Sequence, residues 1–258
     1  MRRILLFLVL IIGAASIGLV GGAAFLSRQN TNATARAEML AADLQQLKIG
    51  ISDYRVAQSI ATNFGSVPYQ NHYGTRDCKD GYFERCAYMI ACDDTPLHRL
   101  LSRHPFLRRR LGFRDWGGTA LIYVENGTVQ EYSFFVTYRT SGRQWRGFGA
   151  EEGKTLPEYP AVQARMSDSY SVERNDVVMD DRPNDLGFQL ESSLTPAATT
   201  TEQRRAWHFE FSCLSRRHGC GEICEVMPDA WQDFYSKRDH FDVEKYGSAY
   251  LFCSKRPN

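Results

Sequence analysis

The stretch that decides the fold is Thr119–Tyr138, which reads TALIYVENGTVQEYSFFVTY. Two runs rich in β-branched and aromatic residues flank Asn126-Gly127, and this dipeptide is the preferred turn of a two-residue β-hairpin. Neighbouring positions of the first run, such as Leu121 and Ile122, point to opposite faces of a strand, and both are apolar. We therefore expect the hairpin to lie at the centre of a sheet that helices cover.

Periodicity and end signals predict the elements on either side of the hairpin. We expect helices over residues 34–50, 52–65, 95–105, 199–218 and 228–234, the fourth opened by a capping box of Thr199 and Glu202. Weaker strand patterns occur at residues 170–178, 187–194 and 250–252, and the glycine- and proline-containing segment 141–169 is typical of a long loop. This mixture predicts an α+β domain with an antiparallel sheet packed by helices.

Length and composition describe an ordinary globular protein. The 258 residues suffice for one domain with attachments, and 43% hydrophobic with 24% charged residues excludes a wholly disordered or fibrous chain. The 31 basic residues nearly balance the 30 acidic ones, for a formal net charge of +1. This balance argues against a dedicated nucleic-acid-binding protein, and we expect no nucleic-acid partner.

The N-terminus predicts a membrane anchor. Residues 4–26 are uncharged and mostly apolar, and as a helix they would span a hydrocarbon core of roughly 30 Å. Arg2 and Arg3 precede this segment, which favours a cytoplasmic N-terminus. The alternative is a signal peptide cleaved at Gly22-Ala23-Ala24. Both interpretations export the rest of the chain.

The anchor divides the chain into four parts and sets its expected location. We expect a single-pass protein of a bacterial inner membrane, with its C-terminal domain in the periplasm or outside the cell. The parts are a cytoplasmic N-terminus at residues 1–3, a transmembrane signal-anchor at 4–26, a polar linker at 27–34 and an exported domain at 35–258.

Small residues within the anchor predict a contact between membrane helices. Ala14, Gly18 and Gly22 are spaced by four residues and share one helix face, which would let two such helices approach closely. We interpret this face either as the interface of a homodimer or as the ordinary glycine and alanine content of a membrane helix.

The seven cysteines favour an oxidising compartment. They form two clusters, and short separations make Cys78–Cys86 and Cys213–Cys220 the preferred disulfides, although spacing alone leaves the pairing open. A metal site in the second cluster is the alternative, because His218 lies between Cys213 and Cys220. Its C-x6-C-x3-C spacing differs from that of zinc knuckles, so we expect no metal there.

A cluster of basic residues is a candidate binding patch. Five arginines fall within twelve residues and are interleaved with aromatic and aliphatic side chains. We interpret them either as a patch for an anionic partner, such as phospholipid headgroups or an acidic protein surface, or as a solvated face over the core. The five are Arg103, Arg108, Arg109, Arg110 and Arg114.

The sequence contains none of the common catalytic or nucleotide-binding motifs GxSxG, GxxxxGK[ST], HExxH and GxGxxG. Adjacent acids such as Glu151-Glu152 are interpreted as solvated loop residues. We therefore predict no catalytic, cofactor-binding or metal-binding residue and no cofactor. The preferred function is a binding or scaffolding module at the cell envelope, with another envelope protein as its partner. The alternative is a hydrolase-like envelope enzyme whose site is assembled from scattered residues.

One local pattern is similar to a known family. Leu47–Ser52 precedes a predicted helix that ends at Phe64-Gly65, and the hairpin Ala120–Val129 follows. Over residues 43–139 at most, this order resembles the small envelope lipoproteins of the SmpA/OmlA type and related inhibitor-like domains. The resemblance implies two helices on an antiparallel sheet and a role in binding other proteins. Because the chain lacks a lipoprotein cysteine after its apolar stretch and continues for about 120 residues beyond the hairpin, it implies no functional residue.

Overall fold

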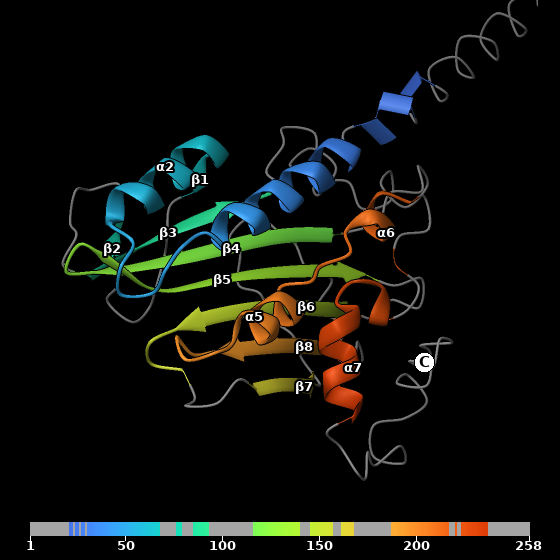
Figure 1. Cartoon of the computed structure of the whole chain (residues 1–258). Helices are drawn as coiled ribbons and strands as arrows, with labels where there is room; N and C mark the ends of the chain where they lie inside the picture. Colours follow the sequence, from blue (N-terminus) through green and yellow to red (C-terminus); the bar gives the residue numbers. More distant parts are fainter. Residues whose placement is uncertain are drawn as a thin grey trace, which may run out of the picture.

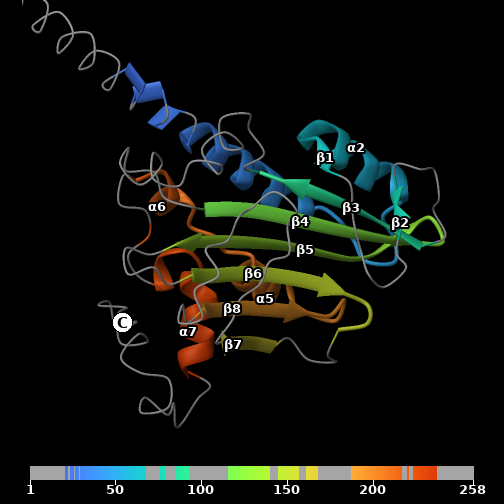
Figure 2. The ribbon, with the colours of Figure 1, turned by 180° about the vertical axis from the view of Figure 1, so that it is seen from behind.

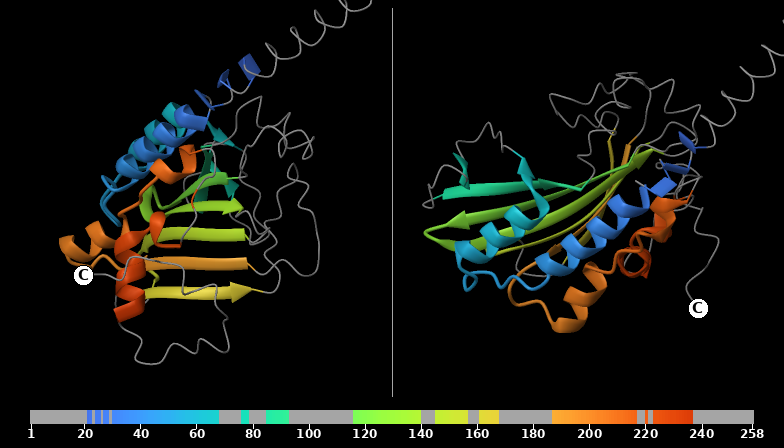
Figure 3. Two further views of the ribbon diagram at one scale, coloured as in Figure 1. Left: turned by 90° about the vertical axis from the view of Figure 1, so that its right-hand side faces the viewer. Right: turned by 90° about the horizontal axis from the view of Figure 1, so that it is seen from above.

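One mixed sheet organises the structure. The computed structural model describes residues 21–22, 24–25, 27–28, 30–67, 76–78, 85–92, 116–139, 145–156, 161–167, 187–216, 220 and 223–236. In this part of the chain the fold is α+β, with an eight-stranded sheet and helices on one of its faces (Figures 1 and 3). The strands are β1 (Ser66–Val67), β2 (Arg76–Asp77), β3 (Arg85–Ala91), β4 (Trp116–Glu125), β5 (Thr128–Arg139), β6 (Trp145–Gly153), β7 (Ala161–Ser167) and β8 (Gly187–Leu194).

The strand order is β1-β3-β4-β5-β6-β8-β7, with β2 paired to β3, and Figure 2 shows it from behind. Most neighbours are antiparallel, but β6 pairs with β8 in parallel, and so does β2 with β3. The prediction of an antiparallel sheet is therefore wrong in its detail. The reason is topological: β8 inserts between β6 and β7 instead of following β7 at the edge.

The predicted hairpin is confirmed as the central pair β4 and β5. Asn126 and Gly127 both have positive φ, 50° and 76°, as the tight turn requires. The turn is held from outside, because Tyr54 N donates to Gly127 O and Val129 N donates to Ser52 O, each at 2.9 Å. Every second residue of β4, from Trp116 to Val124, is buried, whereas the residues between them are partly exposed. The described helices therefore cover only one face of the hairpin.

The predicted loop at 141–169 is wrong, because this segment contains β6 and β7. The glycines of β6 serve packing and do not form turns. A Cβ added to Gly149 would lie 2.3 Å from the Phe135 ring, and one added to Gly153 would lie 2.8 Å from Glu131 Cγ. Side chains of β5 thus lie across β6 at Gly149 and Gly153, and only glycine leaves room for them.

The first helix covers residues 30–44 and includes the described positions back to 21. It packs on the sheet through Ala37, Leu40 and Leu44, which are fully buried. Its start is earlier than the predicted Thr34, and the predicted linker 27–34 is helical at each described position. Two tertiary hydrogen bonds hold the helix to the domain at Asn30, whose Nδ2 donates to Leu214 O at 2.8 Å and whose Oδ1 accepts from Trp116 Nε1 at 2.6 Å.

The predicted anchor at 4–26 lies mostly outside the described residues. Within the described ones, no helix combines the length and the apolar composition that a membrane span needs. The helix predicted at 95–105 and the strands predicted at 170–178 and 250–252 also lie outside the described part of the chain.

Helix α2 (Tyr54–Phe64) lies beside the first helix over β3 and β5 (Figure 1). Its N-cap is Asp53, whose Oδ1 accepts from Arg55 N at 2.8 Å, so the helix begins at Tyr54 and not at residue 52 as predicted. Gly65 closes the helix with a φ of 69°, as expected. Val56 is exposed and does not share the buried face of Ile60.

A second group of helical elements follows β8 in the chain, and two of its members contact the β8-β7 edge of the sheet. Its elements are α5 (Thr200–Ala206), α6 (Ser212–Ser215), the 3-10 helix η2 (Ile223–Glu225) and α7 (Pro228–Ser236). The capping box that opens α5 is confirmed. The prediction of one helix over 199–218 is wrong, because α5 ends at Ala206 and α6 begins only at Ser212. Trp207, Phe209 and Phe211 follow α5 at every second position. Their ring centroids lie 5.2–5.8 Å from that of Tyr132 or Phe134.

Candidate functional site

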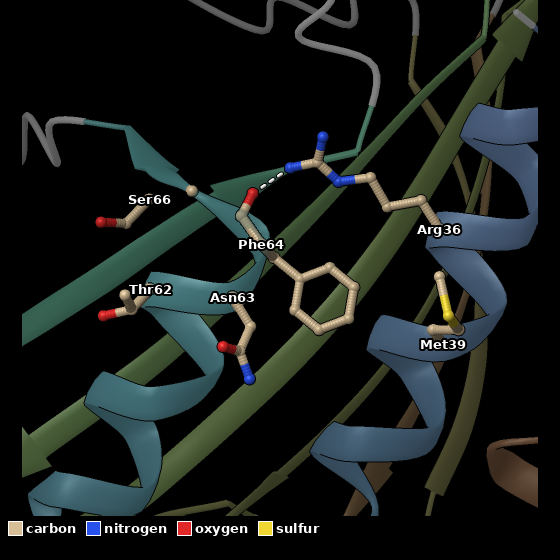
Figure 4. Close-up of a pocket in the computed structure, with 7 residues that line it drawn as sticks. Arg36, Met39, Thr62, Asn63, Phe64 and Ser66 are labelled. Atoms are coloured by element: carbon tan, nitrogen blue, oxygen red, sulfur yellow. Dashed lines mark hydrogen bonds between the residues drawn. The ribbon is translucent and has the colours of Figure 1, made fainter.

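An open groove lies between the first helix and the C-terminal end of α2. Its volume is about 680 Å³. Figure 4 shows Arg36 reaching from the first helix to the end of α2, with Met39 further along the same helix. The lining residues are Arg36, Met39, Thr62, Asn63, Phe64, Gly65 and Ser66.

The groove combines the cation of Arg36 with a helix end and one exposed apolar side chain, that of Met39. The guanidinium of Arg36 donates to the carbonyl oxygen of Phe64, at the last residue of α2. A positive side chain at this end complements the helix dipole. Met39 is 57% exposed although it is large and apolar. A partner segment could therefore contact apolar surface and polar groups in the same groove.

A buried polar cluster joins α5 to the sheet on the other half of the molecule. Glu152 of β6 is only 5% exposed. Its Oε2 accepts from the hydroxyl of Tyr132 at 2.7 Å, and its Oε1 accepts from Gln203 Nε2 of α5 at 3.2 Å. Both of these donors are neutral, so neither supplies a positive charge to a carboxylate at this position.

Burial dominates the electrostatics of this cluster. It raises the pKa of the Glu152 carboxyl above its usual range, and the hydrogen bonds from Tyr132 and Gln203 offset part of this rise. Burial also raises the pKa of the Tyr132 hydroxyl, and the nearby Glu152 charge adds to the effect. The interpretation of Glu152 as a solvated loop residue is therefore wrong.

The opposite face of the same strands carries a second set of acids. Glu151 points away from Glu152, as successive strand residues do, and accepts from Ser193 Oγ at 2.9 Å. Burial raises the pKa of the Glu131 carboxyl, and repulsion from Glu151 raises it further. An acidic cluster alone does not identify a ligand, so we assign no site to these residues.

His208 lies between two carboxylates in the segment after α5. Its Nδ1 is 3.0 Å from Asp229 Oδ2 at the start of α7, and its Nε2 is 3.4 Å from Glu210 Oε1. A histidine oriented by a carboxylate is one part of a general-base arrangement. Sequence reasoning missed this pair, because His208 and Asp229 are 21 residues apart and share no motif.

Both predicted disulfides are confirmed. The Cα atoms of Cys78 and Cys86 are 5.0 Å apart, and those of Cys213 and Cys220 are 4.7 Å apart. Within the described residues, Cys213, Cys220 and Glu225 have potential metal-ligand atoms within 4.8 Å of one another. Because a metal binds the thiolate form of cysteine, the disulfide leaves these two sulfur atoms unsuitable as ligands.

The remaining candidate residues are described only in part. The arginine patch, Arg103 to Arg114, lies outside the described residues, as do Ala14 and Gly18 of the predicted dimer face. Gly22 is helical, and a Cβ added to it would meet no heavy atom within 4 Å. The helix surface at Gly22 is therefore open.

No family model matches the chain, and neither the curated proteins nor the solved structures include one that is detectably similar to it.

Proposed function

We propose that the chain is a single-pass protein of a bacterial inner membrane whose exported domain is a binding or scaffolding module at the cell envelope. The observation that carries this proposal is the first helix. This helix includes every described residue from 21 to 44, and its inner face is buried in the domain core. Its first described positions, 21, 22, 24 and 25, belong to the apolar segment 4–26. The helix therefore connects the end of that segment to the folded domain.

The position of the groove supports a role near the membrane surface. Arg36 follows Leu26, the last residue of the apolar segment, by ten positions, which corresponds to about 15 Å along a helix. A partner held at the same membrane could reach the groove directly. The two disulfides agree with an oxidising compartment outside the cytoplasm.

A resemblance to SmpA/OmlA-type lipoproteins is part of this proposal. Between residues 43 and 139, α2 precedes the β4–β5 hairpin and contacts β5. This order is compatible with a helix layer on a sheet that acts by binding other proteins.

Site-specific photo-crosslinking in native membranes tests the binding role. A photoreactive residue is placed at Met39 or Thr62, which line the groove, and at exposed Gln232 of α7, on the other half of the sheet, as the control. We expect both groove positions to give the same product, identified by mass spectrometry, and the control to give none. Equal labelling at all three positions, or no product from the groove, would contradict the proposal.

A hydrolase-like envelope enzyme is the second candidate, and the His208–Asp229 pair is the observation in its favour. This function predicts turnover of an ester or amide substrate panel by the purified chain. It also predicts that His208→Ala abolishes turnover while leaving the thermal unfolding midpoint nearly unchanged, because His208 is partly exposed.

A further inference from the structure

The contact between α5 and the sheet encloses a carboxyl group. Glu152 of β6 is buried, and its two oxygens accept from Gln203 of α5 at 3.2 Å and from the hydroxyl of Tyr132 of β5 at 2.7 Å. A buried carboxylate is costly unless positive charge and hydrogen bonds compensate it. Because both donors are neutral, the packed position of α5 favours the protonated form of Glu152.

The charges on the surrounding elements do not change this balance. Leu194, which is apolar, lies opposite Glu152 on β8. The acids Glu131 and Glu151 of β5 and β6 lie on the other face of the sheet. The charged residues of α5 and α7 are exposed or have partners of their own, and they are Glu202, Arg204, Arg205, Asp229 and Asp233. Burial is accordingly the largest influence on the pKa of Glu152 and raises it.

Two more buried polar groups lie at this contact. The hydroxyl of Ser192 is fully buried on β8, which α5 contacts. Trp207 directly follows α5, is only 4% exposed, and has its ring centroid 5.2 Å from that of Tyr132. Within the described residues, Ser192 Oγ and Trp207 Nε1 make no hydrogen bond. Water would satisfy both groups if α5 left the sheet, which lowers the cost of opening.

Helix α5 has the features of a segment that opens locally. It is seven residues long, and only Ala206 among these residues is buried. Such a short helix depends on its packing, because it is not stable alone. Segments with few buried groups open with a smaller free energy than the whole fold requires.

We propose that α5 is a proton-controlled cover over Glu152, which lies on the sheet while Glu152 is protonated and opens locally when Glu152 ionises. In the closed state the pKa of Glu152 is raised, whereas in the open state the carboxyl regains its usual value of about 4.3. Opening therefore becomes more favourable as the pH rises above about 4.3, until the closed-state carboxyl ionises as well. The cover does not depend on the membrane topology proposed above.

Hydrogen exchange of the detergent-solubilised full-length chain tests the proposal. The reporters are the amides of Gln203 and Trp207, which donate to Thr199 O at 2.9 Å and to Gln203 O at 3.0 Å. Their protection is compared at about pH 5 and about pH 8, after correction for the intrinsic exchange rate at each pH. We expect the protection of both amides to fall several-fold at the higher pH, while that of the β4–β5 pair stays constant.

Two glutamine variants assign the effect to one carboxyl group. Glu152→Gln keeps the shape of the side chain but cannot ionise, so we expect its α5 protection to be equal at both pH values. Glu151→Gln is the matched control on the opposite face of β6, and it should respond as the wild type does.

Three results would overturn the proposal. The first is wild-type α5 protection that does not change with pH, a result that requires no variant to fold. The second is the same loss of protection in Glu152→Gln as in the wild type. The third is an equal loss in the β4–β5 pair, because the opening would then be global and α5 would not act as a separate cover.

Discussion

Replacing Gly149 with alanine tests the register of the β5–β6 pair, on which the buried Glu152 cluster depends. Gly149 lies opposite Phe135. The new Cβ would stand 2.3 Å from Cδ1 and Cε1 of that ring, whereas carbon atoms pack at about 3.5–4.0 Å. The ring or the strand must therefore move by more than about 1 Å, and overpacking of this kind costs about 1–3 kcal/mol. Because Phe135 is partly exposed, its ring can rotate toward solvent. We therefore expect Gly149→Ala to lower the free energy of unfolding by about 1–2 kcal/mol.

The assay is denaturant unfolding of the detergent-solubilised chain, with Gly149→Ala measured in the wild-type and the Phe135→Ala backgrounds. We expect the cost of Gly149→Ala to fall to nearly zero once the ring is absent. Gly22→Ala is the comparison for a Cβ added without overpacking, since a Cβ there meets no heavy atom within 4 Å, and we expect it to cause no loss of stability. If Gly149→Ala costs the same in both backgrounds, the two residues do not face each other and the register is wrong.

Three further perturbations test the cluster, the first helix and a disulfide. Because the folded-state pKa of Glu152 is raised, ionisation destabilises the fold as pH rises above the usual carboxyl pKa of about 4.3. We expect Glu152→Gln to be more stable than wild type at pH 8, with the difference vanishing below about pH 4; denaturation across this range checks it, and a pH-independent difference would contradict it. Asn30→Ala removes the acceptor of the buried Trp116 Nε1, at 2.6 Å, so we expect a loss of about 1–3 kcal/mol in the free energy of unfolding. Replacing Cys213 and Cys220 by serine opens a short loop, which costs about 2–3 kcal/mol by the chain-entropy estimate; non-reducing peptide mapping of the wild type should show that pair linked.

The local features of the fold could be read from the sequence wherever one short-range signal dominates. The Asn126-Gly127 turn admits positive φ at both positions, and the flanking apolar runs leave the hairpin little choice. The Thr199–Glu202 capping box and the short spacings of the two disulfides are equally local. These predictions succeeded because each depends on residues close together in the chain.

The failures share a long-range cause. Gly149 and Gly153 indicated a loop because nothing nearby in the sequence shows that Phe135 and Glu131 will lie across them. The candidate sites were hidden for the same reason. Glu152 is covered by α5, whose Gln203 donates to its carboxyl and is 51 residues later in the chain.

The helix break after α5 coincides with an alternation of aromatic residues in the sequence. Trp207, Phe209 and Phe211 alternate with a period of two, which differs from the 3.6-residue period of a helix. Their rings stack or meet edge-on with one another and with Phe134. Aromatic packing therefore outweighed the helical spacing of Trp207, Phe211 and Leu214.

The most direct test of the anchored binding module is the intact mass of the native protein in washed membranes, measured after thiols are blocked without reduction. We expect the full 29.4 kDa chain in the membrane fraction, with its disulfides intact. A soluble product whose mass begins near residue 25 would show that the apolar segment is a cleaved signal peptide. A full-length chain with all seven cysteines blocked would contradict the exported location.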